Sequence, residues 1–242
     1  MIHTQDRVIL IHEGKEYYVT AGKGKLSTDK GMIDLSLLPG MAGGETIASH
    51  LGTPFFIRIP RPTDFFCHAR RTGAPMMPKD IGIVCAMTGM NRRDRILDAG
   101  TGSGVAAIFY GGIAGHVTTY EVREDFAERC RKNIADAGLE NVEVVTGDVL
   151  CAEGAYDIVH FDLHITAEHV RHAHRLLSPG GYLACYTPFL EQTFTVMDTA
   201  RELFAEVVCH EILARELTRS ERGTRPSTRV GHTGYITIAR KN

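Results

Sequence analysis

The chain has 242 residues, a formal net charge of −2 and 43% apolar residues. This length is enough to bury a sizeable core, as one large domain or as a medium domain with a small partner. The small net charge excludes a strongly basic nucleic-acid-binding protein, and no apolar run reaches the roughly 20 residues of a membrane span.

The N-terminus has no apolar core of a signal peptide, and the six cysteines form no C-x-x-C pair. Both features indicate a reducing compartment and a cytoplasmic protein. Intracellular disulfides stay open as an alternative if the source is a hyperthermophile.

The first 62 residues predict a small β-rich domain. Turn residues His12–Lys15 separate two apolar segments and indicate a hairpin. The proline pair at 60–62 predicts a boundary, so we expect domains at 1–62 and 63–242. Short strands are predicted over residues 7–11, 16–20, 46–49 and 54–59.

After a helix predicted over 63–71, helical and extended patterns alternate, which indicates a mainly parallel sheet with helices on both faces. No helix separates the last two strands, so we expect them to be antiparallel neighbours. The predicted helices are 80–90, 103–114, 124–137, 166–177 and 190–204. The predicted strands are 95–98, 117–121, 142–146, 156–161, 181–186, 206–213 and 233–240.

Residues 96–104, ILDAGTGSG, are the most informative segment. Glycines allow a tight turn and a close approach of the backbone to a ligand. The spacing is G-x-G-x-G, with Val105 where a dinucleotide fingerprint has its third glycine. Asp98 precedes the turn, where an anion disfavours a pyrophosphate but favours a cationic methionine moiety. The segment therefore predicts S-adenosylmethionine (AdoMet) as cofactor rather than NAD.

Acidic residues follow the next three predicted strands as well. Glu121 is placed to accept hydrogen bonds from both ribose hydroxyls. Asp148 is placed to accept from the adenine amino group, and the Val149 amide to donate to a ring nitrogen. Each acid, including Asp162, has the alternative of being only a helix N-cap. Four acids in order at the ligand-binding edge of one sheet favour AdoMet. The expected fold is thus the Rossmann-like class I methyltransferase fold, with a seven-stranded mainly parallel sheet.

Residues 214–232 form a long connection between the last two strands. Long loops in compact domains are usually functional or disordered. Arginines suit phosphate contacts because the guanidinium presents a planar fork of donors. A solvated loop is the alternative. The arginines are Arg215, Arg219, Arg222, Arg225 and Arg229.

Short motifs spread over nearly the whole chain resemble the tRNA (adenine-N1-)-methyltransferases that modify adenine 58 of the T-loop, in their archaeal and bacterial homo-oligomeric form. Pro-Lys-Asp before the first sheet strand and the terminal Gly-His-Thr are more specific than the glycine turn. The motifs are Lys30-Gly31, His50-Leu51-Gly52, Arg61-Pro62-Thr63, Pro78-Lys79-Asp80, Asp98–Gly104, Asp162-Leu163, Tyr186-Thr187-Pro188 and Val230-Gly231-His232-Thr233.

The resemblance implies methyl transfer from AdoMet to N1 of adenine 58 of tRNA, with adenine 57 left open, by a homotetramer. It implies Asp162 as the catalytic aspartate, also beside the cofactor, and Tyr186 in the substrate pocket. Met77 and His232 are expected near the substrate, together with Arg219, Arg222, Arg225 and Arg229. The residues implied to hold AdoMet are Asp98, Gly100, Thr101, Gly102, Ser103, Gly104, Glu121, Asp148 and Val149.

The sequence departs from the family at two places near the expected adenine pocket. Met77 stands where the family often has an aromatic residue, and residues 164–166, His-Ile-Thr, stand where prolines commonly follow the aspartate. Lys79 and Asp80 have two interpretations, as the start of a helix or as lining of the cofactor cleft.

Two other functions, and a metal site, fit the sequence less well. A non-catalytic tRNA-binding subunit of the same fold would have a degraded glycine turn, and this turn is intact. A methyltransferase for proteins or small molecules would not need the arginine-rich connection and the N-terminal domain. His169 and His172 are spaced i, i+3, but no second ligand pattern accompanies them, so no metal is expected.

Overall fold

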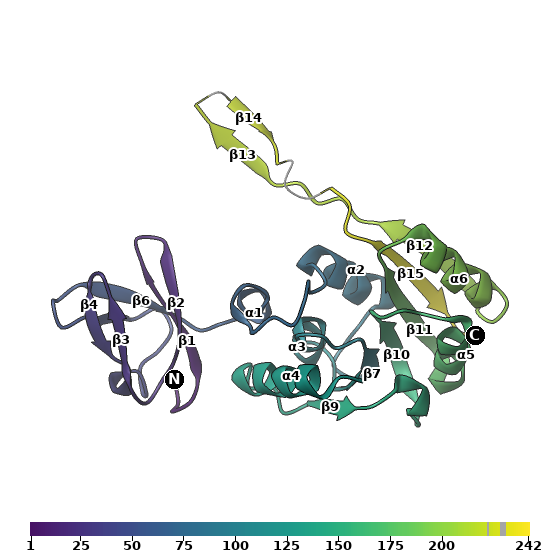
Figure 1. The fold of residues 1–242 in the computed structure, drawn as a ribbon, viewed down its shortest axis with the longest axis horizontal. Helices are drawn as coiled ribbons and strands as arrows, with labels where there is room; N and C mark the ends of the chain where they lie inside the picture. The colour runs from purple at the N-terminus through teal and green to yellow at the C-terminus, as the bar shows by residue number, and fades with distance from the viewer. Residues whose placement is uncertain (222, 228–230) are drawn as a thin grey trace.

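The computed structural model describes residues 1–221, 223–227 and 231–242. A seven-stranded sheet flanked by helices forms the larger body, and a small β-rich module is joined to it through α1 (Pro62–His68) (Figure 1).

The central sheet has the order β12-β15-β11-β10-β7-β8-β9. Strand β15 runs antiparallel to its two neighbours, and the other pairs are parallel. This confirms the expected class I methyltransferase fold and its antiparallel last pair. The strands are β7 (Arg95–Ala99), β8 (His116–Glu121), β9 (Val142–Thr146), β10 (Tyr156–Phe161), β11 (Leu177–Thr187), β12 (Glu206–Glu211) and β15 (Tyr235–Arg240).

Strand β11 begins at Leu177, four residues before the predicted start. The Ser-Pro-Gly-Gly segment at 178–181 continues the strand because its backbone is hydrogen-bonded to Lys241 near residue 242. Gly180 donates to the Lys241 carbonyl at 3.1 Å, and the Lys241 amide donates to Gly181 at 2.9 Å.

Each face of the sheet has its own hydrophobic core, because successive residues of a strand point to opposite faces. Ile96 and Ile158 belong to the core beneath α2, α3 and α4, whereas Leu97 and Val159 belong to the core beneath α5 and α6. Asp98 and His160 therefore lie on the α3 face. The helices are α2 (Pro78–Thr88), α3 (Val105–Gly111), α4 (Glu124–Asp136), α5 (Ala167–Leu176) and α6 (Leu190–Arg201).

The N-terminal module has a separate core that includes Val8, Leu10 and Phe55. Its predicted hairpin is confirmed as β1 and β2, and a second hairpin, β3 and β4, was not predicted. The separate core supports our proposal of a domain boundary at residue 62. The strands are β1 (Arg7–His12), β2 (Lys15–Thr20), β3 (Lys25–Thr28), β4 (Gly31–Asp34), β5 (Thr46–Ala48) and β6 (Pro54–Arg58).

Contacts between charged side chains join the module to the larger body. Arg7 of β1 pairs with Asp136 of α4 at 2.9 Å. Arg58 pairs with Asp64 of α1 at 3.0 Å, and Glu16 lies 2.9 Å from His68 at the end of the same helix. Helix α1 is thus fixed by polar contacts from two strands of the module.

The long connection between the last two strands contains a hairpin of β13 (Leu217–Ser220) and β14 (Gly223–Pro226), which projects away from the body (Figure 1). Arg219 and Arg225 lie on it, whereas Arg222 and Arg229 lie outside the described residues. Within the described part of the chain, no helix is long and apolar enough to cross a membrane.

Candidate functional site

Two adjoining cavities lie at the carboxyl ends of β7, β8 and β10, where open α/β sheets bind their ligands. The first, of about 380 Å³, is lined by residues that include Glu121 and Asp148. The second, of about 220 Å³, lies over the glycine-rich turn. Gly100, Arg123 and Asp162 line both cavities, so one elongated ligand can extend from one to the other.

The glycine-rich turn depends on the absence of side chains. Gly100, Gly102 and Gly104 have φ values of 85°, 52° and 78°, in the left-handed region that favours glycine. A Cβ on Gly100 would overlap the backbone carbonyl of Asp162, and one on Gly104 would lie 2.6 Å from Cys130 Sγ. The turn therefore packs directly against Asp162, the residue after β10, and against α4. Ser103 is also buried, and its Oγ accepts from the Thr72 amide at 3.0 Å.

Asp98 was expected to face a cationic methionine moiety, but both of its carboxylate oxygens already have polar partners. Thr119 donates to Oδ2 at 2.5 Å, and His160 Nδ1 lies 2.6 Å from Oδ1. Thr101, also expected at the cofactor, contacts Thr119 Oγ1 at 2.5 Å and donates to the Tyr120 carbonyl at 2.9 Å. Asp98 and Thr101 both line the second cavity. These two side chains form a buried support beneath the turn.

Glu121 ends β8 and lies 3% exposed in the wall of the larger cavity. Its carboxylate accepts from the Gly102 amide at 3.1 Å and from Arg123 Nε at 2.9 Å. Burial acts to raise the pKa of Glu121, but the hydrogen bonds from Arg123 and Gly102 outweigh it, and the pKa is lowered. Glu121 is thus an ionised acceptor, and a ribose would compete with Arg123 for it.

Asp148 and Val149 line the same cavity. The Asp148 side chain caps the short 3-10 helix Val149–Cys151 by accepting from the Leu150 amide at 2.9 Å. One carboxylate oxygen of Asp148 is therefore used as a helix N-cap, which was the alternative role. The second oxygen can still accept a hydrogen bond from a ligand. Among the described residues, no group of three or more His, Cys, Asp and Glu side chains is placed to hold a metal ion.

Asp162 follows β10 and separates the two cavities. Burial raises the pKa of this carboxyl group to about 6, with an opposing effect of His160 and a further rise from the charge of Asp98. A carboxyl group with this pKa is mainly ionised at pH 7 but titrates near neutrality. It is therefore suited to accept a hydrogen bond from a polar group that enters the cleft.

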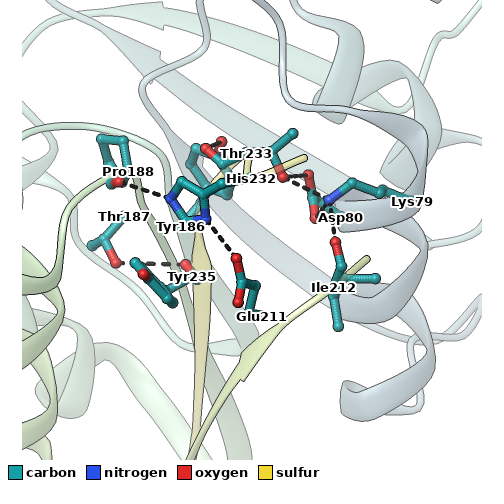
Figure 2. A network of polar contacts seen from close by, with 10 residues as sticks. All are labelled: Lys79, Asp80, Tyr186, Thr187, Pro188, Glu211, Ile212, His232, Thr233 and Tyr235. Atoms are coloured by element: carbon teal, nitrogen blue, oxygen red, sulfur yellow. Dashed lines mark hydrogen bonds and ion pairs between the residues drawn. The ribbon is translucent and has the colours of Figure 1, made fainter. Parts of the chain in front are cut away.

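Tyr186 and His232 lie at the neighbouring strand ends, outside the lining of both cavities (Figure 2). The Tyr186 hydroxyl donates to the Thr233 carbonyl at 2.5 Å, and its ring packs against Gly234. Burial, and the charges of Asp162 and Asp80, raise the pKa of Tyr186 to about 12. His232 contacts Glu211 at 2.7 Å and the Pro188 carbonyl at 3.2 Å.

Lys79 and Asp80 form a latch that the sequence did not reveal. Lys79 Nζ donates to Asp80 at 2.6 Å, to the Ile212 carbonyl at 2.7 Å and to Thr233 Oγ1 at 2.6 Å (Figure 2). Thr233 Oγ1 donates to the other Asp80 oxygen at 2.9 Å. The pair thus joins the start of α2 to the segments that follow β12 and precede β15. Neither of the two predicted roles, helix start alone or cleft lining, describes this latch fully.

The expected substrate residues do not all come together. Met77 lines a separate, mostly apolar cavity with Phe66, Lys79 and Arg215. Arg219 and Arg225 are exposed on the projecting hairpin.

Two residues of the cleft, His160 and Arg123, were not predicted as site residues. For Arg123 the signal was its position two residues after Glu121. For His160 the signal was the presence of a polar residue on the same strand face as Asp162.

The fold and this cleft define a class I AdoMet-dependent methyltransferase. The family described as tRNA methyltransferase complex GCD14 subunit matches residues 68–224, and the chain belongs to this family. It is 32% identical to the tRNA (adenine(57)-N(1)/adenine(58)-N(1))-methyltransferase TrmI of Methanocaldococcus jannaschii, over 97% of this chain and 94% of the relative.

Two solved structures are similar over nearly the whole chain. An SAM-dependent O-methyltransferase from Thermotoga maritima is 30% identical, with a TM-score of 0.85 over 99% of this chain and 94% of that one. The tRNA (m1A58) methyltransferase TrmI from Aquifex aeolicus is 23% identical, with a TM-score of 0.80 over 100% and 98%. The second likeness bears on the fold alone.

The close packing at Gly100 predicts different costs for two alanine substitutions. Gly100→Ala should lower the free energy of unfolding by more than about 3 kcal/mol, because backbone atoms of Asp162 must move. Gly102→Ala is the matched control. Its Cβ would meet nothing nearer than 3.7 Å, so only the left-handed backbone opposes it, at about 1–2 kcal/mol. Urea denaturation measures both, and equal losses would contradict the packing argument.

Removing Asp80 should destabilise the latch. Asp80 is fully buried, and Asp80→Ala leaves the Lys79 ammonium without its carboxylate. We expect a loss of about 3–5 kcal/mol of unfolding free energy. Lys79→Met combined with Asp80→Ala should recover part of this loss, since no unpaired charge remains. Thermal and urea unfolding measure the stability of both variants. A double variant less stable than Asp80→Ala would refute the explanation that an unpaired Lys79 charge causes the loss.

Proposed function

We propose that this protein transfers the methyl group of AdoMet to N1 of adenine 58 in the T-loop of tRNA, with adenine 57 as a second target. Membership of the tRNA methyltransferase family and the end-to-end similarity to the archaeal TrmI support the acceptor. The observation that carries the proposal is the position of Asp162, which follows β10 and lines both cavities at their junction.

The residues present fit AdoMet. The first cavity offers Glu121 for the ribose and Asp148 with the Val149 amide for the adenine. The second offers the glycine turn, whose side-chain-free backbone can approach a methionine moiety closely. AdoMet, when bound, supplies an electrophilic methyl group on a sulfonium sulfur.

Asp162 would act on the acceptor base. Adenine N1 has a lone pair, so no proton has to leave before attack. Positive charge builds up on the ring as the bond to carbon forms. An ionised Asp162 that accepts from the exocyclic amino group would orient N1 and stabilise this charge. Tyr186 lies at the adjacent strand end, where its ring edge could pack against an extruded base.

The test is a methyl-transfer assay with labelled AdoMet and unmodified tRNA. Mass spectrometry of nuclease fragments should find N1-methyladenine at position 58, and at 57 if both are targets. A tRNA with guanine at both positions is the control. Protein and small-molecule hydroxyl acceptors belong in the same assay, because the Thermotoga relative is described as an O-methyltransferase. Methylation of these acceptors without methylation of tRNA would refute the proposal.

Substitution of Asp162 should separate chemistry from binding. Asp162→Ala should lower the single-turnover rate by roughly a hundredfold or more, about 2.7–4 kcal/mol, as for the loss of one preorganised electrostatic group. Affinity for S-adenosylhomocysteine should change little, since Glu121 and Asp148 remain. Asp162→Asn keeps an acceptor without the charge, so its residual rate measures how much positioning contributes. A parent-like rate for Asp162→Ala would exclude the mechanism.

The pH dependence follows from the same carboxyl group. Burial raises the pKa of Asp162 to about 6, and the ionised form is the acceptor. The single-turnover rate should therefore fall as the pH drops through about 6, and level off above it. Asp162→Asn should lose this transition, whereas an unchanged profile in that variant would assign the transition to another group.

The projecting hairpin is proposed to contact tRNA phosphates. Arg219→Ala with Arg225→Ala should weaken tRNA binding and reduce the slope of log K against log salt by about 1 for each phosphate that is no longer neutralised. Arg92→Ala with Arg93→Ala, two exposed arginines in the turn before β7 and thus at the amino end of the sheet, is the matched control. An unaltered slope in the hairpin variant would give this hairpin a different role, such as a subunit contact.

We further propose a cytoplasmic homotetramer. Exposed apolar side chains on and before the hairpin, Leu217 at 67% and Leu213 at 57% exposed, support self-association. Sedimentation equilibrium measures the oligomeric state directly.

A further inference from the structure

A buried carboxylate–imidazole pair lies directly beneath the proposed methyl-transfer site. Asp98 of β7 and His160 of β10 are register partners on adjacent strands, with Nδ1 2.6 Å from Oδ1. They are 2% and 0% exposed. Thr119 holds the second oxygen of Asp98. The carboxylate is therefore fixed on both sides.

The other ring nitrogen of His160, Nε2, is buried and has no hydrogen-bond partner among the described residues. The ring meets Tyr110 of α3 edge to face at 5.2 Å, and the hydroxyl of that tyrosine is likewise buried and without a partner there. An orphaned buried imidazole nitrogen costs stability, which indicates that the residue serves something other than packing.

His160 also lines one cavity together with two carboxyl groups. The smaller cavity is lined by Asp98, His160 and Asp162, and within the described part of the chain no other acidic side chain lines it. Asp162 follows His160 by two residues, so both lie toward the α3 face of β10. Two carboxylates at one site cannot both stay ionised cheaply unless a cation or donor separates them.

Titratable groups from several elements surround Asp162, and the larger cavity adds Glu121, Asp148, His164 and His169. Asp98 comes from β7, His160 from β10, Tyr110 from α3 and Tyr186 from β11. Arg123, after β8, lines the same cavity. Of the charges that act on the pKa of Asp162, His160 lowers it and Asp98 raises it. His160 is thus the group that opposes the influence of Asp98.

We propose that His160 is a positioning residue for methyl transfer, which binds Asp98 and thereby leaves Asp162 as the ionised carboxylate that faces the acceptor base. This inference rests on the proposed role of Asp162. It adds a residue that acts only through another side chain, because His160 itself is inaccessible. An apolar residue at 160 would leave Asp98 held by Thr119 alone and facing Asp162 without screening.

The test uses the full chain and two measurements. NMR of ¹³Cγ-labelled aspartate follows the titration of Asp162, with the signal assigned by its absence in Asp162→Asn. Single-turnover rates on tRNA give the second midpoint. The variants are His160→Leu, which removes the imidazole that binds Asp98, His160→Gln, which keeps a hydrogen-bond donor for Asp98 without the imidazole, and His160→Leu with Asp98→Asn, which also removes the opposing carboxylate.

We expect the Asp162 midpoint of His160→Leu to rise by about one pH unit or more, with about a tenfold lower rate below the midpoint and recovery at high pH. His160→Gln should shift less, and the double variant should return toward the parent midpoint. Thermal unfolding and S-adenosylhomocysteine binding confirm a folded cleft. If His160→Leu does not fold, the smaller shift of the Asp162 midpoint in His160→Gln tests the proposal instead.

An unmoved Asp162 midpoint in a folded His160 variant, or a rate loss that high pH does not recover, would overturn the proposal. The NMR titration needs no acceptor. A parent protein inactive on tRNA would therefore refute the proposed function while the carboxyl titration still tests His160.

Discussion

The close approach of two backbones, at Gly100 and Asp162, is the constraint on which the site depends. The Asp162 amide donates to the Ala99 carbonyl at 2.9 Å, so the chain leaving β10 is hydrogen-bonded to the chain entering the glycine turn. No side chain fits between them. This approach sets Asp162 at the junction of the two cavities and directs the turn toward Glu121. A shift there would separate the proposed cofactor residues from the proposed catalytic carboxylate.

The second half of the site is held by contacts with the start of α2. Lys79 and Asp80 at the start of α2 bind Thr233, whose carbonyl accepts from Tyr186. His232 adds contacts to Glu211 and to the Pro188 carbonyl. These hydrogen bonds hold the base of the connection that carries the projecting hairpin. The proposed RNA-contacting segment is therefore attached firmly at the edge of the cleft.

The sequence predicted most helices and strands of the fold, but it did not predict which side chains contact one another. Alternating strand and helix patterns, with glycine after β7, were enough for the sheet and for the edge at which the acids gather. The partners of each acid were not accessible in the same way. Asp98 meets His160 only because their strands are neighbours, although 62 residues separate them in the chain. Glu121 was expected to be free for a ribose, but Arg123 turns back onto it.

The hairpin illustrates the same limit. Its arginines were visible in the sequence, but β13 and β14 were not, because four-residue strands with exposed side chains on both faces have no hydrophobic period to reveal them. Met77 was placed near the adenine pocket by family position alone. Met77 lines a mostly apolar cavity with Arg215, separate from the two cavities at the sheet edge, and its place near the acceptor adenine stays a prediction.

The latch between Lys79 and Thr233 has a consequence for biosynthesis. It joins residues 154 positions apart, and Thr233 belongs to the segment that leads into the last strand. Chains fold from the N-terminus as the ribosome extends them, so the glycine turn and the strands around it can form early. The edge that carries Tyr186 stays without this latch until residue 233 has been made. A nascent chain would thus form the half of the cleft proposed for the cofactor before the half proposed to receive RNA.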